Sequence, residues 1–338
     1  MNLMDSKYTS FGLVRDMMAS VDVVANFQAD QARETGKAIA QLKCLLLTGE
    51  GSSRIFPARN AIANARRLNW NIALHTESAR QAQEYDLSSW AVFAASNSGK
   101  TSEVIKLYQQ LKSKNNKNLF GLTATDNSKL AELAARTYVL KCGPENAVAA
   151  TKSVIEMALF YHAMLEHGCG IPLLGRRCKQ LAEDFRAALT LKLDPKLIDK
   201  IAAGGAIYFA GRNDGVAEEL TLKANEITRK KSDFLEGTYA VHGIEEVMDK
   251  NDVVIWLDPY EDSLDKFRDV LVKGVGLTVI TVGPKATSFP SIVVPESDLQ
   301  PYVLMAAGWN ILVDVGVKLG INLDKPVRAR KVGNEFVG

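Results

Sequence analysis

Cysteine and histidine are scarce in this chain of 338 residues, with four of each. The cysteines show no CxxC spacing and no accompanying histidine cluster; they are Cys44, Cys142, Cys169 and Cys178. This pattern indicates neither a zinc site nor a disulfide framework. We therefore expect no metal, and a reducing cytoplasm is the simplest location.

An excess of one charge and long apolar runs are missing as well. The 41 Lys and Arg residues nearly balance the 39 Asp and Glu residues and are interspersed with them. This balance removes the usual electrostatic argument for nucleic-acid binding. No apolar run approaches the roughly 18 residues of a membrane span, and the opening MNLMDSKYTS lacks a signal-peptide core. We expect a cytoplasmic protein that binds neither nucleic acid nor membrane.

The sequence does contain one conspicuous strand and loop, within a chain long enough for two domains. Ala91 to Ala95 is an apolar run without polar alternation, which is typical of a parallel strand covered on both faces. The polar loop SNSGKT (96–101) follows it and precedes a helical pattern from Glu103 to Leu111. Hydroxyls and free N–H groups at a helix start predict an anion site at the carboxyl end of the strand.

The sequence of this loop allows two other interpretations. Gly99-Lys100-Thr101 is the ending of a nucleotide P-loop, but Ala94 stands where the leading glycine should be and lies inside the strand. Nucleoside triphosphate binding is therefore the weaker alternative. A capped turn between a strand and a helix, without a ligand, is the other.

The pattern along the chain predicts alternating strands and helices. Apolar residues at helical spacing in 8–35 predict one or two N-terminal helices. In the first half, strands are expected at 43–48, 71–75, 91–95, 118–123 and 138–141, and helices at 55–68, 78–85, 103–111, 128–136 and 153–167. A charged, amphipathic connector follows from Gly175 to about Ala203.

The second half repeats the plan of the first. Strands at 206–210, 253–257 and 277–282 echo those at 45–48, 92–95 and 118–123, with similar spacing. We expect a duplicated α/β unit in which each copy is a parallel sheet between helices. The acidic loop DPYEDS in the second copy would repel a phosphate, so the anion site is expected in the first copy. The predicted segments are 1–35 (N-terminal helices), 36–172 (phosphate-binding domain), 173–203 (connector), 204–324 (domain with the catalytic helix) and 325–338 (tail).

Six segments in one order resemble the tandem sugar isomerase (SIS) family. They are GEGSS, SNSGKT, ENAVAATK, ELTLKANEIT, His242 with Gly243, and KPVRARK. The likeness is to the isomerase domain of glucosamine-6-phosphate synthase and to its stand-alone deaminase and deglycase relatives, and it covers nearly the whole chain. The resemblance implies two tandem SIS domains, each a flavodoxin-like three-layer sandwich.

The resemblance also implies which residues bind the substrate. Matching positions assign the 6-phosphate of a sugar to Ser52, Ser53, Ser96, Asn97, Ser98 and Thr101, with Asn97 replacing a more usual glutamine. Gly51, Val148 and Ala149 would contact the rest of the substrate. Hydroxyl and backbone donors at helix N-termini bind phosphate without a mandatory cation, which supports this role independently.

Proton-transfer chemistry is expected on the helical segment ELTLKANEIT. Glu219, Lys223 and Glu226 share one helical face, which is usually the pattern of a surface ion-pair ladder. Lys223, however, falls at the edge of an apolar stripe and is a candidate for desolvation. In the resembling family the residue matching Glu226 moves a proton between C1 and C2, and the lysine matching Lys223 supports charge on the substrate oxygen. A carboxylate and an ammonium on one face suit that reaction.

Two further residues are implied by the resemblance. His242, beside a glycine in a loop, would open the sugar ring, and in relatives this histidine comes from the neighbouring subunit, which implies a homodimer with a shared active site. Lys331 matches a lysine that contacts the carbonyl end of the substrate or forms a Schiff base with it. From the residues alone, RARK is only a basic tail.

The expected function is that of a cofactor-free enzyme acting on a phosphorylated amino sugar. It would isomerise and deaminate an aldosamine 6-phosphate or, alternatively, act as a fructosamine-6-phosphate deglycase. No glutaminase domain and no nucleophilic cysteine after Met1 precede the SIS pair, so glutamine-dependent synthesis is not expected. A sugar-phosphate-binding regulatory module is the alternative from another class.

Overall fold

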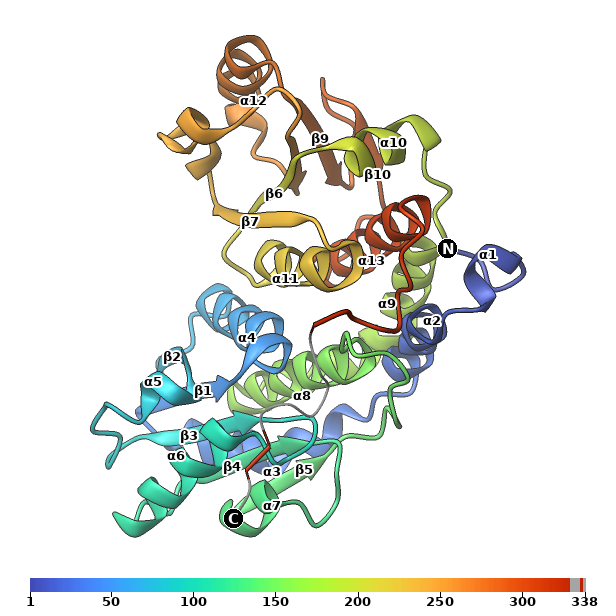
Figure 1. Cartoon of the computed structure of the whole chain (residues 1–338). Coiled ribbons are helices and arrows are strands. Elements are labelled where there is room, and N and C mark those ends of the chain that lie inside the picture. Colours follow the sequence, from blue (N-terminus) through green and yellow to red (C-terminus); the bar gives the residue numbers. More distant parts are fainter. Residues whose placement is uncertain (329–334, 337–338) are drawn as a thin grey trace. The chain divides into compact units, whose positions relative to one another are not determined.

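The computed structural model describes residues 1–328 and 335–336 of the chain (Figure 1). Its contacts divide these residues into two compact units. The first-sheet unit contains Asp22–Glu145, Ala150–Lys179 and the described residues after Val327. The second-sheet unit contains Met1–Val21, Asn146–Ala149 and Gln180–Val327. Each unit is built around one sheet and is described by itself.

Five parallel strands form the first sheet, in the order β2-β1-β3-β4-β5. They are β1 (Cys44–Gly49), β2 (Ala73–Ser78), β3 (Ala91–Ala95), β4 (Leu119–Thr123) and β5 (Arg136–Val139). The chain leaves β1 for β2 on one side and continues to β3 on the other. Gly49 and Ala95 are register partners, so β1 and β3 end side by side at this switch point. Ligands of open parallel sheets bind there.

Helices cover both faces of this sheet, which explains why β3 is apolar throughout. Val92 and Ala94 belong to the buried cluster that includes Val104 and Leu107 of α6 (Ser102–Ser113). Phe93 points to the opposite face, where its ring lies 5.1 Å from that of Tyr161 on α8 (Lys152–Gly168). The helices α3 (Arg33–Ala40) and α4 (Ile55–Arg67) pack against α8. The unit therefore has three layers.

Four elements expected in this half have other bounds in the structure. The helix expected at 128–136 is only α7 (Lys129–Leu133), because Ala134 is extended and the N–H of Ala135 bonds to Leu119 instead of continuing the helix. Arg136 therefore begins β5, and the strand expected at 138–141 starts and ends two residues earlier. The strand expected at 71–75 runs over Ala73–Ser78, which leaves only the short helix α5 (Ala79–Ala82) after it.

The second sheet has the same topology. Its order is β10-β9-β8-β6-β7, also all parallel, with β6 (Ala206–Gly211), β7 (Lys231–Glu236), β8 (Val253–Leu257), β9 (Thr278–Gly283) and β10 (Ser291–Val293). Counted from β7 to β10, its order matches the first sheet strand for strand. The prediction of an α/β protein with a duplicated parallel unit is confirmed.

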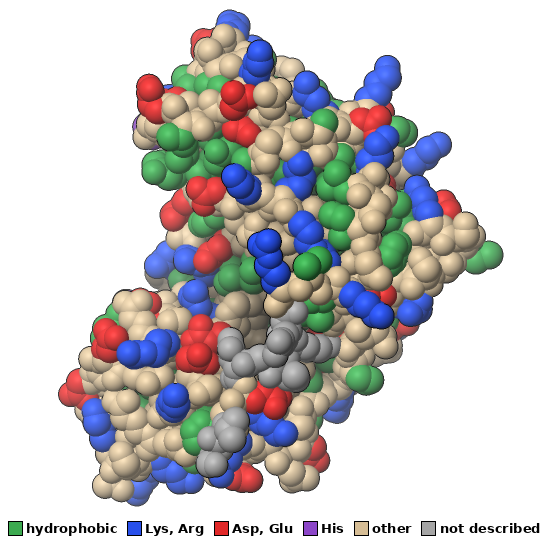
Figure 2. Space-filling view, in the orientation of Figure 1, with side chains coloured by type: hydrophobic (Ala, Val, Ile, Leu, Met, Phe, Trp, Pro, Cys, Tyr) green, Lys and Arg blue, Asp and Glu red, His purple; other side chains and the backbone are tan. Residues whose placement is uncertain are grey.

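The remaining described segments are mostly helical. At the N-terminus α1 (Ser6–Thr9) and α2 (Gly12–Ala25) precede α3, and α9 (Leu174–Thr190) and α10 (Pro195–Ala203) form the connector. Beside the second sheet lie α11 (Val216–Thr228), α12 (Leu264–Phe267), a π-helix (Arg268–Val275) and α13 (Gln300–Lys318). Within the described part of the chain, no helix combines the length and apolarity needed to cross a membrane. On the face drawn in Figure 2, basic and acidic side chains are interspersed.

Candidate functional site

The anion loop, residues 96–101, turns between β3 and α6. Ser96 continues the sheet, since its N–H donates to the carbonyl of Leu122. Gly99 then takes a left-handed conformation with φ of 62° and donates to the carbonyl of Ser96 at 3.0 Å. A Cβ atom at this position would lie 2.3 Å from Ser128 Oγ and 2.8 Å from Thr123 Oγ1. Both the turn and the close packing therefore require glycine.

The hydroxyl groups of the loop leave the start of α6 without a side-chain cap. Thr101 is the N-cap residue of this 12-residue helix, yet its side chain makes no capping bond. Its Oγ1 instead pairs with Ser96 Oγ at 2.7 Å. The alternative of an ordinary capped turn therefore does not describe this loop. An uncapped helix start beside serine and threonine hydroxyls is suited to binding an anion.

A second loop begins beside the anion loop. Gly51–Ser53 is a single 3-10 turn after β1, and α4 follows it directly. Because Gly49 and Ala95 are paired, this turn and the anion loop both leave the sheet at the switch point. Ser52 is buried and Ser53 half-buried. Nearby, burial raises the pKa of the Glu50 carboxyl above its ordinary value.

Glu145, which was not among the residues predicted for the site, holds the anion loop at Asn97. Glu145 accepts a hydrogen bond from Asn97 Nδ2 at 2.9 Å and one from the N–H of Thr151 at 2.7 Å. It therefore connects the loop to the start of α8. The sequence signal for Glu145 is an acidic residue just before the small-residue segment NAVAAT, within the ENAVAATK segment that resembles the SIS family.

The described end of the chain also meets the anion loop. Glu335 forms an antiparallel bridge with Thr101, and the N–H of Phe336 donates to the carbonyl of Lys100 at 2.8 Å. The Phe336 side chain packs on the apolar cluster beneath α6. The side chain of Lys100 is exposed. Lys331 lies outside the described residues.

In the second-sheet unit, α11 carries a buried lysine between two carboxylates. Lys223 and Glu219 are both 0% exposed, and their charged groups are 3.4 Å apart. The ammonium lies 2.8 Å from the carboxylate of Glu226, whose side chain is 28% exposed. A surface ion-pair ladder would be solvated on all members. Lys223 is desolvated, as expected from the sequence. Glu226 is the member of the cluster that solvent reaches.

The helix α11 packs closely on α13. Leu220 of α11 lies so near Gly308 of α13 that a Cβ atom there would lie 2.3 Å from the leucine side chain. Glu219 and Lys223, on the same helix, are both away from water. An isolated ammonium would be costly in such a place, so its two carboxylate neighbours are needed to hold it. Glu219 is the member whose role the sequence analysis left unassigned.

His242 follows a single 3-10 turn, Tyr239–Val241, and is exposed. Its Nε2 lies 3.0 Å from the ammonium of Lys266. A lysine ammonium only donates, so Nε2 accepts this hydrogen bond.

The predicted substrate contacts at Val148 and Ala149 belong to a different unit from the anion loop. Asn146–Ala149 groups with the second sheet, and the N–H groups of Asn146 and Ala147 donate to Asp16 of α2. Val148 is half-buried and Ala149 buried. Their contact with a substrate stays a prediction.

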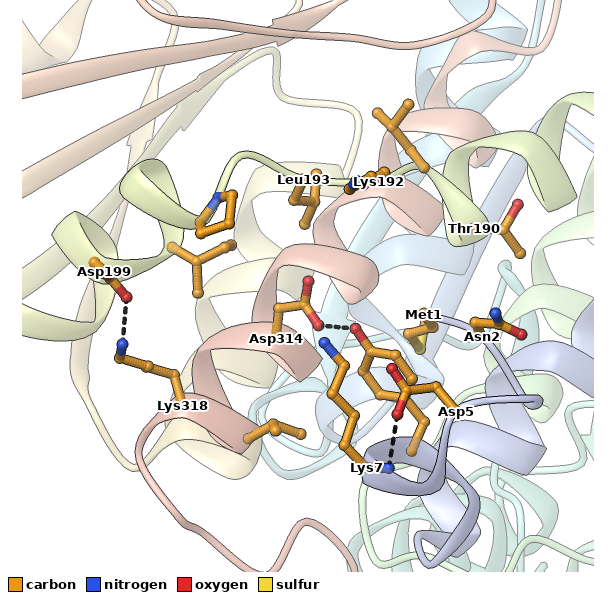
Figure 3. A pocket seen from close by; sticks show the side chains of 15 residues that line it. Met1, Asn2, Asp5, Lys7, Thr190, Lys192, Leu193, Asp199, Asp314 and Lys318 are labelled. Atoms are coloured by element: carbon orange, nitrogen blue, oxygen red, sulfur yellow. Dashed lines mark hydrogen bonds and ion pairs between the residues drawn. The ribbon is translucent and has the colours of Figure 1, made fainter.

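A pocket of about 550 Å³ in the second-sheet unit holds none of the predicted site residues (Figure 3). Several charged groups on its wall are paired with one another. Lys318 lies 2.6 Å from Asp199, and Tyr8 donates to Asp314. Burial lowers the pKa of the Met1 amino group beside it. Elsewhere among residues 1–328 and 335–336, no cluster of His, Cys, Asp and Glu is arranged to hold a metal ion.

Comparison with known proteins identifies the first unit. Residues 88–167 match the family described as SIS domain. The chain contains a SIS domain. The matched segment of this domain runs from the start of β3 through the anion loop to the end of α8. No curated protein sequence matches the chain.

Solved structures extend the SIS fold to nearly the whole chain. The C-terminal domain of glucosamine-fructose-6-phosphate aminotransferase from Francisella tularensis is 18% identical, with a TM-score of 0.79, covering 95% of this chain and 100% of that one. Glucosamine-6-phosphate deaminase from Thermotoga maritima is 21% identical, with a TM-score of 0.70 and coverage of 94% and 98%. Tagatose-6-phosphate ketose/aldose isomerase from Escherichia coli is 16% identical, with a TM-score of 0.76 and coverage of 96% and 99%. With the matching strand orders of the two sheets, this likeness makes the fold that of two tandem SIS domains.

Proposed function

We propose that this chain is a sugar-phosphate isomerase-type enzyme that acts on a phosphorylated amino sugar and releases the amine. The observation that carries the proposal is the buried Lys223 held between Glu219 and the partly exposed Glu226. A protein that only binds a sugar phosphate has no need of a desolvated ammonium beside an accessible carboxylate. Two proteins of similar structure, a glucosamine-6-phosphate deaminase and a tagatose-6-phosphate ketose/aldose isomerase, agree with this class of reaction.

The anion loop would bind the phosphate end of the substrate. Serine and threonine hydroxyls and the uncapped start of α6 provide neutral donors for phosphate oxygens. Ser52 and Ser53 join them from the loop after β1, which leaves the sheet at the same switch point. This set of donors requires no metal ion.

The α11 cluster would perform the proton transfer. In the open-chain aldose form, the Glu226 carboxylate takes the proton from C2 and returns it to C1. The Lys223 ammonium stabilises the negative charge that develops on the oxygen attached to C1. Water then adds at C2 of the resulting imine and the amine leaves, so that an amino-sugar phosphate and water give a ketose phosphate and ammonia. His242 would accept or return the proton during ring opening.

We further propose that the working form is a homodimer in which His242 serves the partner's site, as the resemblance implies. Complementation tests this directly. Glu226→Gln and His242→Ala proteins are each expected to be inactive, and a mixture refolded together is expected to regain part of the activity. Light scattering that shows a monomer at all concentrations would contradict the shared site.

The choice of substrate is tested by assaying three compounds. Glucosamine 6-phosphate and galactosamine 6-phosphate are incubated with the protein and released ammonia is measured, whereas with fructoselysine 6-phosphate released lysine is measured. Ammonia from the first two supports the deaminase, and lysine from the third supports the deglycase alternative. Turnover of none, together with binding of sugar phosphates, would favour the regulatory module, and Glu226→Gln would then leave that binding response intact.

A further inference from the structure

Glu145 has a role beyond connecting the loop to α8, because its two oxygens accept hydrogen bonds from Asn97, Thr151 and Ser153. Oε1 accepts from the N–H groups of Thr151 at 2.7 Å and Ser153 at 3.3 Å. Oε2 accepts from Asn97 Nδ2 and from Ser153 Oγ, both at 2.9 Å. All of these residues lie in the first-sheet unit, beside the anion loop.

This carboxylate decides which way the amide of Asn97 points. An ionised carboxylate only accepts hydrogen bonds, so the Asn97 atom that faces it must be the NH₂ group. The second hydrogen of Nδ2 is directed at Ser153 Oγ, also at 2.9 Å. That oxygen is able to accept because its own proton goes to Glu145. Both amide hydrogens are therefore used within the protein.

Only the carbonyl oxygen Oδ1 of the amide remains for a ligand, and the described residues offer it no hydrogen-bond partner. Phosphate oxygens are acceptors near neutral pH, and two acceptors repel each other. Ser96, Ser98 and Thr101 of the loop carry hydroxyls that are able to donate to phosphate, and the exposed Lys100 carries an ammonium. Asn97 is the acceptor among these donors.

We propose that the Asn97 side chain is not a phosphate ligand but a specificity-determining acceptor. It takes a hydrogen bond from a hydroxyl or ammonium group on the carbon chain of the sugar, and Glu145 is the residue that positions it. The inference rests on the proposed function, because it assumes a sugar phosphate whose phosphate lies in the anion loop. It replaces the phosphate-binding role that the resemblance assigns to this side chain.

Glu145→Gln tests the proposal directly, because it reverses the direction of the hydrogen bond between residue 145 and the Asn97 side chain. The two N–H groups of Thr151 and Ser153 would keep the oxygen of the new amide on their side, which places its NH₂ toward Asn97. Asn97 must then turn its own oxygen to that NH₂ and present hydrogens to the ligand. The site would lose an acceptor and gain a donor. In Asn97→Leu the new side chain has nearly the same size as asparagine but neither accepts nor donates a hydrogen bond.

The experiment measures the dissociation constants of inorganic phosphate and glucosamine 6-phosphate for each protein by calorimetry. The readout is their ratio, with correct folding checked by thermal melting. Both Glu145→Gln and Asn97→Leu are expected to lower the preference for the sugar over inorganic phosphate by about fivefold or more, the effect of one lost hydrogen bond to a charged or polar donor. Glu145→Gln should bind inorganic phosphate more tightly than Asn97→Leu does.

A matched control is Glu156→Gln. Glu156 is a second carboxylate on α8 that accepts from the N–H groups of Lys141 and Cys142, away from Asn97. Its variant should keep the wild-type ratio. The inference is overturned if Asn97→Leu weakens both ligands equally, which would make Asn97 a phosphate ligand, or if Glu145→Gln leaves the ratio unchanged. If the wild-type protein binds inorganic phosphate but binds no sugar phosphate more tightly than inorganic phosphate, the proposed function fails, and this inference fails with it.

Discussion

The Lys223 ammonium lies 2.8 Å from the Glu226 carboxylate at a point where the lysine is fully buried and the glutamate is not. The second carboxylate, Glu219, lies on the buried side at 3.4 Å. One ammonium thus bridges a carboxylate inside the protein and one at its surface. This arrangement holds a positive charge where water is excluded while leaving a base accessible to a small molecule.

Removing that ammonium should destabilise the protein strongly. In Lys223→Met the buried carboxylate of Glu219 loses the ammonium that lies 3.4 Å away, and we expect the free energy of unfolding to fall by about 3–5 kcal/mol. Denaturant unfolding measures it. Lys318→Met is the matched control, because Lys318 and Asp199 form an ion pair in the same unit with side chains 54% and 55% exposed. Its cost should stay below about 1 kcal/mol. Equal costs would contradict the buried cluster.

Gly99 should tolerate no side chain. In Gly99→Ala the new Cβ atom sits on a backbone with positive φ and lies against Ser128. In Gly143→Ala the backbone also has a positive φ, 73°, but no atom lies within 4 Å of the Cβ atom. We expect Gly143→Ala to cost about 1–2 kcal/mol from backbone strain alone. Gly99→Ala should cost a further ~1–3 kcal/mol from overpacking and should also weaken phosphate binding. The thermal melting points of the two variants compare these effects, and Gly143→Ala being the less stable one would refute the argument.

The hydroxyl of Thr101, rather than the charge of Lys100, should matter for anion binding. Thr101→Val removes the partner of Ser96 and a donor at the start of α6. A lost hydrogen bond to a charged ligand predicts roughly tenfold or greater weakening of inorganic phosphate binding. Lys100→Gln should weaken it less, because the Lys100 side chain is exposed. The reverse order would revive the nucleotide P-loop alternative, in which the lysine contacts the phosphates directly.

Glu166 should make the first-sheet unit sensitive to acid. Burial alone would raise the pKa of its carboxyl, but hydrogen bonds from His162 and from the N–H groups of Leu173 and Leu174 outweigh burial and lower it below the ordinary 4.5. A depressed pKa means that the stabilisation is complete above the ordinary pKa and is lost as the pH falls through the folded-state value. The stability difference between wild type and Glu166→Gln should therefore shrink as the pH falls below the ordinary 4.5. A difference that grows on acidification would contradict this assignment.

The sequence predicted the central strands and loops well because they carry strong local signals. β3 is apolar throughout since helices cover both faces, and Gly99 marks the turn that only glycine permits. β7 and β10 were not anticipated. β7 is an edge strand whose residues alternate between exposed and half-buried over most of its length, and β10 has only three residues, so neither presents an apolar run.

The candidate site was predictable only in part for a similar reason. Helical spacing placed Glu219, Lys223 and Glu226 on one face, but it could not show that two of the three are fully buried, because burial depends on tertiary packing. Likewise, the hydrogen bond from Asn97 to Glu145 joins residues 48 positions apart, and no local pattern predicts such a contact. The direction in which the Asn97 amide points follows from that contact.

The most direct test of the account is the rate at which deuterium leaves C2 of glucosamine 6-phosphate labelled at that carbon, followed by NMR. The wild-type protein is predicted to remove the label, and Glu226→Gln to do so about 10²–10⁴-fold more slowly while still binding the sugar phosphate. A Glu226→Gln protein that removes the label at the wild-type rate would contradict the central claim.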